Sequence, residues 1–251
     1  DLHRVDRRQR QMCIRDSFST PRLRGVMALN LVVAAAGSIV VVNTVNYVRD
    51  QLGGTQADVA WMLAASGGGT LLVALFLPRV LDRIAERVVM MTGAAVLLSG
   101  VLAAVAMTAI QAASWMITAP IWVVIGGGMA LIVTPTGRVI RGSVAKSELP
   151  AAFAAQFSLS HLAWLVTYPI AGWVGTASGF TLAWSILAAL AVFGAIAAQM
   201  LWPREKRTET IVAGTDAETA TGGLALREAV SYTHRRCRRA TLCRSPWSPY
   251  H

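Results

Sequence analysis

Charged residues are scarce in this chain. Asp, Glu, Lys and Arg make up 14% of the 251 residues, whereas 55% are hydrophobic and the mean hydropathy is +0.52. This composition suits a protein whose solvent is a lipid bilayer rather than water. No Asp or Glu lies deep within any of the long apolar stretches described below, so their interiors contain no carboxylate to carry a proton.

Cysteine is nearly absent as well. Cys13, Cys237 and Cys243 lie close to the two ends, and their spacing fits neither a disulfide framework nor a zinc site. Residues 8–17 and 230–244 resemble translated sequencing adapter. We therefore expect residues 1–17 and 231–251 to be artefactual, and the natural chain to continue beyond one or both ends. The alternative is a disordered basic tail at each end.

The motifs of common enzymes are also missing. The sequence has no phosphate-binding G-x-x-x-x-G-K-[ST], no G-x-G-x-x-G and no H-E-x-x-H, so we expect no enzyme, cofactor or metal. An intramembrane hydrolase needs a serine within reach of a histidine base. Ser160 adjoins His161, but neighbouring residues on a helix point about 100° apart. An intramembrane hydrolase is therefore one alternative to the function inferred below, and a six-helix membrane protein that transports nothing is the other.

Six long apolar stretches dominate what the sequence does contain. Each has about 20 residues or more, the length that an α-helix needs to cross about 30 Å of hydrocarbon. We predict an all-α membrane protein with six transmembrane helices. The stretches are residues 25–48, 57–77, 88–110, 115–135, 151–174 and 180–202.

Basic residues between these stretches fall on alternate sides of the membrane. One side has Arg49 alone, whereas the other side and the two flanks have Arg22, Arg24, Arg79, Arg83, Arg87, Arg138, Arg141, Lys146, Arg204, Lys206 and Arg207. Basic loops stay in the cytoplasm, so we expect both ends of the six-helix domain, residues 18–203, to be cytoplasmic. Residues 204–230 are polar and predict a flexible cytoplasmic tail. Most of the net charge of +10 lies in the two ends, so no nucleic-acid partner is expected.

The connections between the stretches predict how the helices are arranged. Longer links after the first and fourth stretches hint at two three-helix repeats, and because three is odd these would be inverted. Thr55 with Asp58 predicts a capping pair, and Pro150 fits a first helical turn. Glycine triplets at 67–69 and 126–128 predict close helix contacts.

Residues 78–87 resemble a known loop signature. They fit G-x-x-x-D-R-x-G-R-R of the major facilitator superfamily at Asp82, Arg83 and Arg87, but Pro78 and Ala85 replace its glycines and Glu86 one of its bases. Residues 22–203 resemble the carboxyl-terminal half of these transporters, in a bacterial branch. The resemblance implies a half-bundle of two inverted three-helix repeats, a solute moved by alternating access, and a missing amino-terminal half as partner.

An acid–base loop at this position is a candidate gate. Asp82 is placed to face the amino end of a neighbouring helix and to pair with Arg83, Arg138 or Arg141, and such contacts form in one conformer and break in another. The alternative is a solvated loop that only sets topology. The candidate gating residues are Asp82, Arg83, Arg87, Arg138 and Arg141.

Polar residues within the stretches are the candidate solute contacts. Gln156, Ser160, Trp164 and Thr167 share one helical face. Amides and flat rings together suit a mid-sized organic solute, although they also serve to join helices. The full candidate set is Asn43, Asn46, Gln156, Ser160, His161, Trp164 and Tyr168. Histidine titrates close to neutral pH, so His161 is a candidate carrier of a coupled proton, the alternative being a neutral hydrogen-bonding residue.

Overall fold

The computed structural model describes residues 20–202, and within that range the chain is helical with no strand. The expectations for residues 1–17, 204–230 and 231–251, and for the three cysteines, lie outside the described residues. The helices are α2 (Pro21–Ser38), η1 (Ile39–Asn43), α3 (Thr44–Asp50), α4 (Gln56–Leu81), α5 (Glu86–Ala109), α6 (Trp115–Ser143), η2 (Lys146–Glu148), α7 (Leu149–Pro169), η3 (Ile170–Val174), α8 (Gly175–Ser178) and α9 (Phe180–Leu201). Of these, η1 and η3 are π-helical turns and η2 is a 3-10 turn.

Six helical segments are long and apolar enough to cross a membrane, which confirms the predicted number of spans. They are Pro21–Asp50, Gln56–Leu81, Glu86–Ala109, Trp115–Ser143, Lys146–Ser178 and Phe180–Leu201. The first and fifth spans are α2–η1–α3 and η2–α7–η3–α8, each with a π-helical turn inside it.

The longer links predicted after the first and fourth spans are wrong. The first link is only residues 51–55, and α6 continues past Pro135 to Ser143, leaving residues 144–145 before η2. The first residues of both predicted links are instead the last turns of α3 and α6. They stay helical because a helix satisfies its own backbone hydrogen-bonding groups. At the start of α4 the predicted capping pair is confirmed, with Asp58 Oδ2 accepting from the Thr55 N–H at 2.7 Å and from its hydroxyl at 2.8 Å.

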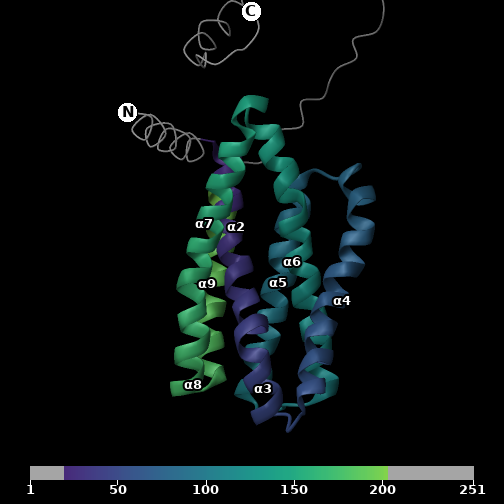
Figure 1. Ribbon diagram of the computed structural model, residues 1–251, viewed down its shortest axis with the longest axis vertical. Coiled ribbons are helices and arrows are strands. Elements are labelled where there is room, and N and C mark those ends of the chain that lie inside the picture. Colours follow the sequence, from purple (N-terminus) through teal and green to yellow (C-terminus); the bar gives the residue numbers. More distant parts are fainter. Residues whose placement is uncertain (1–19, 203–251) are drawn as a thin grey trace, which may run out of the picture. The chain divides into compact units, whose positions relative to one another are not determined.

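Successive spans run in opposite directions, so basic residues gather at one end of the bundle. The end where α2 begins and α9 finishes is called the basic end here (Figure 1). Its cations within the described residues are Arg22, Arg24, Arg79, Arg83, Arg87, Arg138, Arg141 and Lys146. The other end, where α3, α8 and the link to α6 lie, has Arg49.

The packing of the six spans supports two inverted repeats. The first repeat comprises α2, α4 and α5, and the second comprises α6, α7 and α9. The first span of each repeat packs against the second and third spans of the other: α2 against α7 and α9, and α6 against α4 and α5. The last spans of the two repeats, α5 and α9, touch each other, as do the first spans, α2 and α6. Exchanging the repeats therefore reproduces the main contacts. Because α2 leaves the basic end and α6 returns to it, the repeats have opposite orientations.

Glycines bring α6 close to two neighbours. A Cβ on Gly126 would collide with the Ser66 carbonyl of α4, and one on Gly128 would lie 2.8 Å from Leu97 Cγ of α5. The prediction of close contacts is wrong for Gly67 and Gly68, which face outward with nothing within 4 Å of an added Cβ. Only Gly69 of that triplet faces α6.

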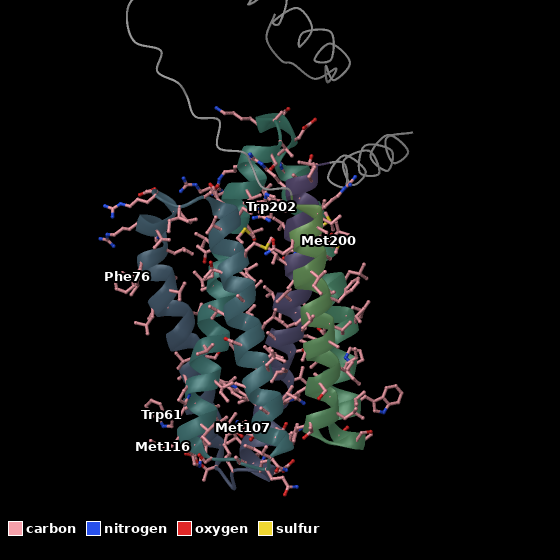
Figure 2. The ribbon with its side chains drawn as sticks, turned by 180° about the vertical axis from the view of Figure 1, so that it is seen from behind. Trp61, Phe76, Met107, Met116, Met200 and Trp202 are labelled. Atoms are coloured by element: carbon pink, nitrogen blue, oxygen red, sulfur yellow. The ribbon has the colours of Figure 1, made fainter. Side chains whose placement is uncertain are left out.

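Large apolar side chains cover the outer surface. Trp61 and Phe76 of α4 are 74% and 62% exposed and project away from the bundle, as does Met200 of α9 (Figure 2). In water such a surface would drive aggregation, but against lipid tails it is well solvated.

Candidate functional site

A cavity of about 640 Å³ lies between α2, α6 and α7. Most of its wall is apolar, and a few polar side chains interrupt it, which is the usual make-up of a small-molecule site. The lining residues are Asn30, Val33, Met129, Val133, Thr136, Gly137, Ile140, Phe153, Gln156, Phe157, Ser160 and Trp164. None of them is charged.

Three of the predicted solute contacts meet in this cavity. Gln156, Ser160 and Trp164 lie on the same face of α7 and line its wall, and the fourth member of that face, Thr167, is fully buried. The Trp164 ring lies over Gly37 of α2, where any Cβ would collide with it. A glycine at this position therefore lets a flat ring form the wall of the cavity.

Asn30 is a lining residue that the sequence reasoning missed. Its Nδ2 is buried and has no hydrogen-bond partner among the described residues. An unpaired buried donor is unfavourable by about 1–3 kcal/mol, which makes Asn30 Nδ2 a candidate to pair with a bound ligand. The available signal was a single amide in the otherwise apolar first half of span 25–48.

His161 lies beside the cavity rather than in its wall. Its side chain is exposed on α7, with its ring centroid 4.0 Å from that of Phe157. Tyr168 is likewise exposed, and its ring centroid lies 5.0 Å from that of Trp164 in an edge-on arrangement. The Ser160 hydroxyl is 3.4 Å from His161 Nδ1, closer than helix geometry predicted. Nδ1 is also 2.8 Å from the Phe157 carbonyl, which can only accept a hydrogen bond. The Ser160 hydroxyl donates to the same Phe157 carbonyl at 2.8 Å, so its proton is directed at the backbone and not at His161.

The two asparagines predicted near the outer end of the first span lie outside the cavity. Asn43 is buried, and its amide is used twice: Nδ2 donates to the Ala171 carbonyl at 2.8 Å, and Oδ1 accepts from Trp184 Nε1 at 3.1 Å. These bonds join the π-helical turns η1 and η3 to α9. Asn46 is exposed on α3. We call Asn43, Ala171 and Trp184 the outer clasp.

An aromatic cluster surrounds the outer clasp. Tyr47 lies 5.1 Å from Trp184 and 6.1 Å from Trp122 between ring centroids, and Trp122 Nε1 donates to Thr44 Oγ1 at 2.8 Å. All four side chains are buried, and their polar atoms are paired with neighbours. Asn43 and the rings around it are therefore part of a packed core at the end of the bundle opposite the basic end.

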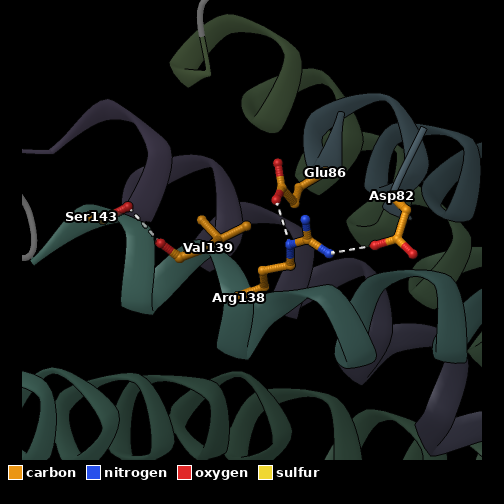
Figure 3. Close-up of polar contacts among 5 residues, drawn as sticks. All are labelled: Asp82, Glu86, Arg138, Val139 and Ser143. Carbon is orange, nitrogen blue, oxygen red and sulfur yellow. Dashed lines mark hydrogen bonds and ion pairs between the residues drawn. The ribbon is translucent and has the colours of Figure 1, made fainter. Parts of the chain in front are cut away.

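The candidate gating residues lie at the basic end. Arg138 of α6 pairs with Glu86 at 3.0 Å between Nε and Oε1, and with Asp82 at 3.7 Å between Nη1 and Oδ1 (Figure 3). Of the three predicted partners of Asp82, the structure thus shows Arg138. It also shows a second acidic partner of Arg138, Glu86, which the sequence analysis did not include. Asp82 follows the last residue of α4 and is 73% exposed.

The other predicted gating arginines have different surroundings. Arg87 caps the end of α9, donating from Nε to the Trp202 carbonyl at 3.0 Å and from Nη2 to Gln199 Oε1 at 2.9 Å. Arg141 lies at the basic end of the cavity, since its Nη2 would be 3.7 Å from a Cβ on Gly137. Arg83 is exposed in the link between α4 and α5. Within residues 20–202 no group of His, Cys, Asp or Glu is placed to hold a metal ion.

Six spans in two inverted repeats, with an uncharged cavity between them, define an integral membrane protein of the transporter class. A sequence profile described as Major Facilitator Superfamily matches residues 26–247. The match covers most of the chain, so the chain belongs to this family. No curated protein matches the sequence.

Proposed function

We propose that the chain is the carboxyl-terminal half of a secondary transporter that moves a small organic solute by alternating access. The cavity between α2, α6 and α7 is the observation that carries this proposal. Its unpaired amide at Asn30, the amide of Gln156 and the flat ring of Trp164 suit an uncharged solute of moderate size with both hydrogen-bonding and aromatic groups.

The outer faces of α4 and α7 support a missing amino-terminal half. In their most apolar windows only 22% of the α4 span and 11% of the α7 span are buried, against 72% for the first span. Lipid is a poor partner for the exposed His161 and the partly exposed Ser160 on α7, because polar groups in hydrocarbon are costly. On α4 the outward Gly67 and Gly68 suit close approach by another helix. We infer that a second bundle covers both faces and closes the cavity.

The Arg138 ion pairs supply a gate in this scheme. They tie α6, a wall of the cavity, to Asp82 in the α4–α5 link and to Glu86 at the start of α5. Exposed pairs of this kind contribute about 0–1 kcal/mol each, so they bias two conformers without locking one. His161, beside the cavity, is the proposed carrier of a coupled proton. The basic end faces the cytoplasm of a bacterium, with the six spans in its cytoplasmic membrane.

A flux assay tests the proposal. The gene is completed from source DNA, and its product is placed in liposomes and screened for uptake of uncharged aromatic amides. We expect saturable flux that Gln156→Ala reduces at least about tenfold, since each lost hydrogen bond to a bound polar group weakens binding by about that factor. Ser99→Ala is the matched control, because Ser99 is exposed on α5 and bonds its own helix. An intact gene that encodes no further spans would contradict the proposal, as would flux unaffected by Gln156→Ala.

A further inference from the structure

A second hollow lies on the outer surface between α2 and α9, with a volume of about 330 Å³. We call it the α2–α9 groove. Its floor is closed, because Gly194 of α9 lies so near α2 that an added Cβ would be 2.9 Å from the Ala28 carbonyl. Its walls are apolar except at one end, and they include Arg24, Met27, Leu31, Phe193, Ala197 and Leu201.

The groove is separate from the cavity. Residues 24, 27, 28 and 31 recur at the helical period and form one stripe of α2. At about 100° per residue, Asn30 and Val33 of the cavity fall on the opposite side of that helix. The groove therefore faces outward while the cavity faces the interior, and occupation of one does not require the other.

Charge is distributed unevenly along the groove. Arg24 lies one turn inside the start of α2, at the basic end, and Leu31 lies about 10 Å further into the apolar part of the span. Arg87 lies near the same end, capping α9 through the Trp202 carbonyl, and the Trp202 ring packs on Gly25. Two guanidinium groups thus flank the end of α9, and no acidic residue lines the groove.

We propose that the α2–α9 groove binds an anionic phospholipid, with an acyl chain between α2 and α9 and the phosphate on Arg24. Basic pockets between transmembrane helices at the membrane surface suit such head groups. A guanidinium has five N–H donors in a planar fork whose geometry matches phosphate oxygens. A zwitterionic head group fits less well, because its ammonium would be repelled by the two arginines.

Native mass spectrometry of the full 251-residue chain tests this site. The protein is released from mixed micelles containing phosphatidylglycerol or phosphatidylethanolamine, and the bound lipid is counted. We expect one retained phosphatidylglycerol, little phosphatidylethanolamine, and about fivefold weaker retention of phosphatidylglycerol in Arg24→Gln, the loss expected for one cation near a lipid head group. Arg22→Gln is the matched control, since Arg22 lies in the same turn of α2 but outside the groove.

A second variant tests the apolar part of the groove. Ala197→Trp fills it while leaving Arg24 in place, so we expect it to lose the retained lipid as well. Circular dichroism and gel filtration confirm that each variant keeps its fold. Equal retention of the two lipids by the wild type would overturn the proposal, and so would Arg24→Gln retaining phosphatidylglycerol as well as Arg22→Gln does. If Ala197→Trp does not fold, the two arginine variants still decide the question.

Discussion

Asn30 and Asn43 lie on the same span, yet their side chains meet opposite surroundings. The Asn43 amide has a donor and an acceptor in place, whereas Asn30 Nδ2 is buried without a partner. A saturated amide holds helices together, and an unsaturated one is available to a ligand. Substituting each asparagine by leucine therefore gives a matched pair of variants, one removing a paired amide and one removing an unpaired amide.

Asn43→Leu is expected to destabilise the bundle. The change leaves the buried Trp184 N–H without its acceptor and removes the bond to the Ala171 carbonyl, at a cost of about 1–3 kcal/mol in the free energy of unfolding. Thermal unfolding in detergent, followed by circular dichroism, measures the effect as a fall in Tm. A Tm equal to that of the wild type would show that the outer clasp contributes nothing.

Asn30→Leu is expected to leave the stability of the bundle unchanged or to raise it. Leucine has nearly the same volume and removes an unpaired donor, so the free energy of unfolding should stay within about 1 kcal/mol of the wild type or rise. In the completed transporter the same change should abolish solute binding or weaken it at least about tenfold. Destabilisation comparable to that of Asn43→Leu would mean that Asn30 is part of the packing instead.

At the scale of residues, the sequence predicted which side chains share a helix face but not which neighbouring helix that face meets. The period of α7 correctly grouped Gln156, Ser160 and Trp164, because a helix fixes which side chains share a face. Period alone does not say which face of α2 meets α7, so Asn43 was grouped with the cavity and Asn30 was overlooked. That choice depends on contacts between residues more than 100 positions apart, such as Asn43 with Ala171.

At the scale of the helices, features set by neighbouring residues were predictable, whereas features set by contacts with other helices were not. The six spans follow from hydrophobic length alone, and the cap at Thr55 and Asp58 follows from a local pairing. The glycine triplets do not distinguish inward from outward faces. A Cβ on Gly126 would collide with α4, whereas one on Gly67, in an equally glycine-rich triplet, would meet nothing within 4 Å among the described residues.

Alanine substitutions at these two glycines should have opposite effects. Gly126→Ala drives a methyl group into the Ser66 carbonyl and should destabilise the α4–α6 pair by about 1–3 kcal/mol. Gly67→Ala meets open space and should stabilise α4 by up to about 1 kcal/mol through lower backbone entropy in the unfolded chain. Tm values of the two variants in detergent give the comparison, and equal values would contradict the packing described above.

The ion pairs at the basic end lead to a graded prediction. Glu86 lies 3.0 Å from Arg138 and is partly buried, whereas Asp82 lies 3.7 Å away and is largely exposed. Both Asp82→Asn and Glu86→Gln should therefore reduce transport by the completed protein, and Glu86→Gln should reduce it more, while membrane insertion and Tm change little. Initial rates of solute flux measure the order. Normal transport by both variants would exclude the gate.

Across the whole bundle, topology was more predictable than connection length. Six spans and an alternating charge pattern were visible in the sequence, because lipid imposes a fixed helix length and the membrane surface sorts basic residues. The symmetry of the two repeats was inferred from link lengths that proved wrong. The packing supports it instead, through α2 with α7 and α9 matched by α6 with α4 and α5. Helix packing depends on close-fitting side chains, which a hydropathy pattern does not describe.

The orientation of this bundle in the membrane yields the last prediction. The basic end has eight cations within the described residues and the opposite end has Arg49, so the basic end should face the cytoplasm. With Cys13, Cys237 and Cys243 replaced by serine, Gln51→Cys places a single thiol in the first link and Arg83→Cys places one in the α4–α5 link. A membrane-impermeant maleimide should label Gln51→Cys in intact bacterial cells and Arg83→Cys only after lysis. Labelling of both after lysis is the control, and the reverse order in intact cells would invert the topology and with it the cytoplasmic position of the Arg138 gate.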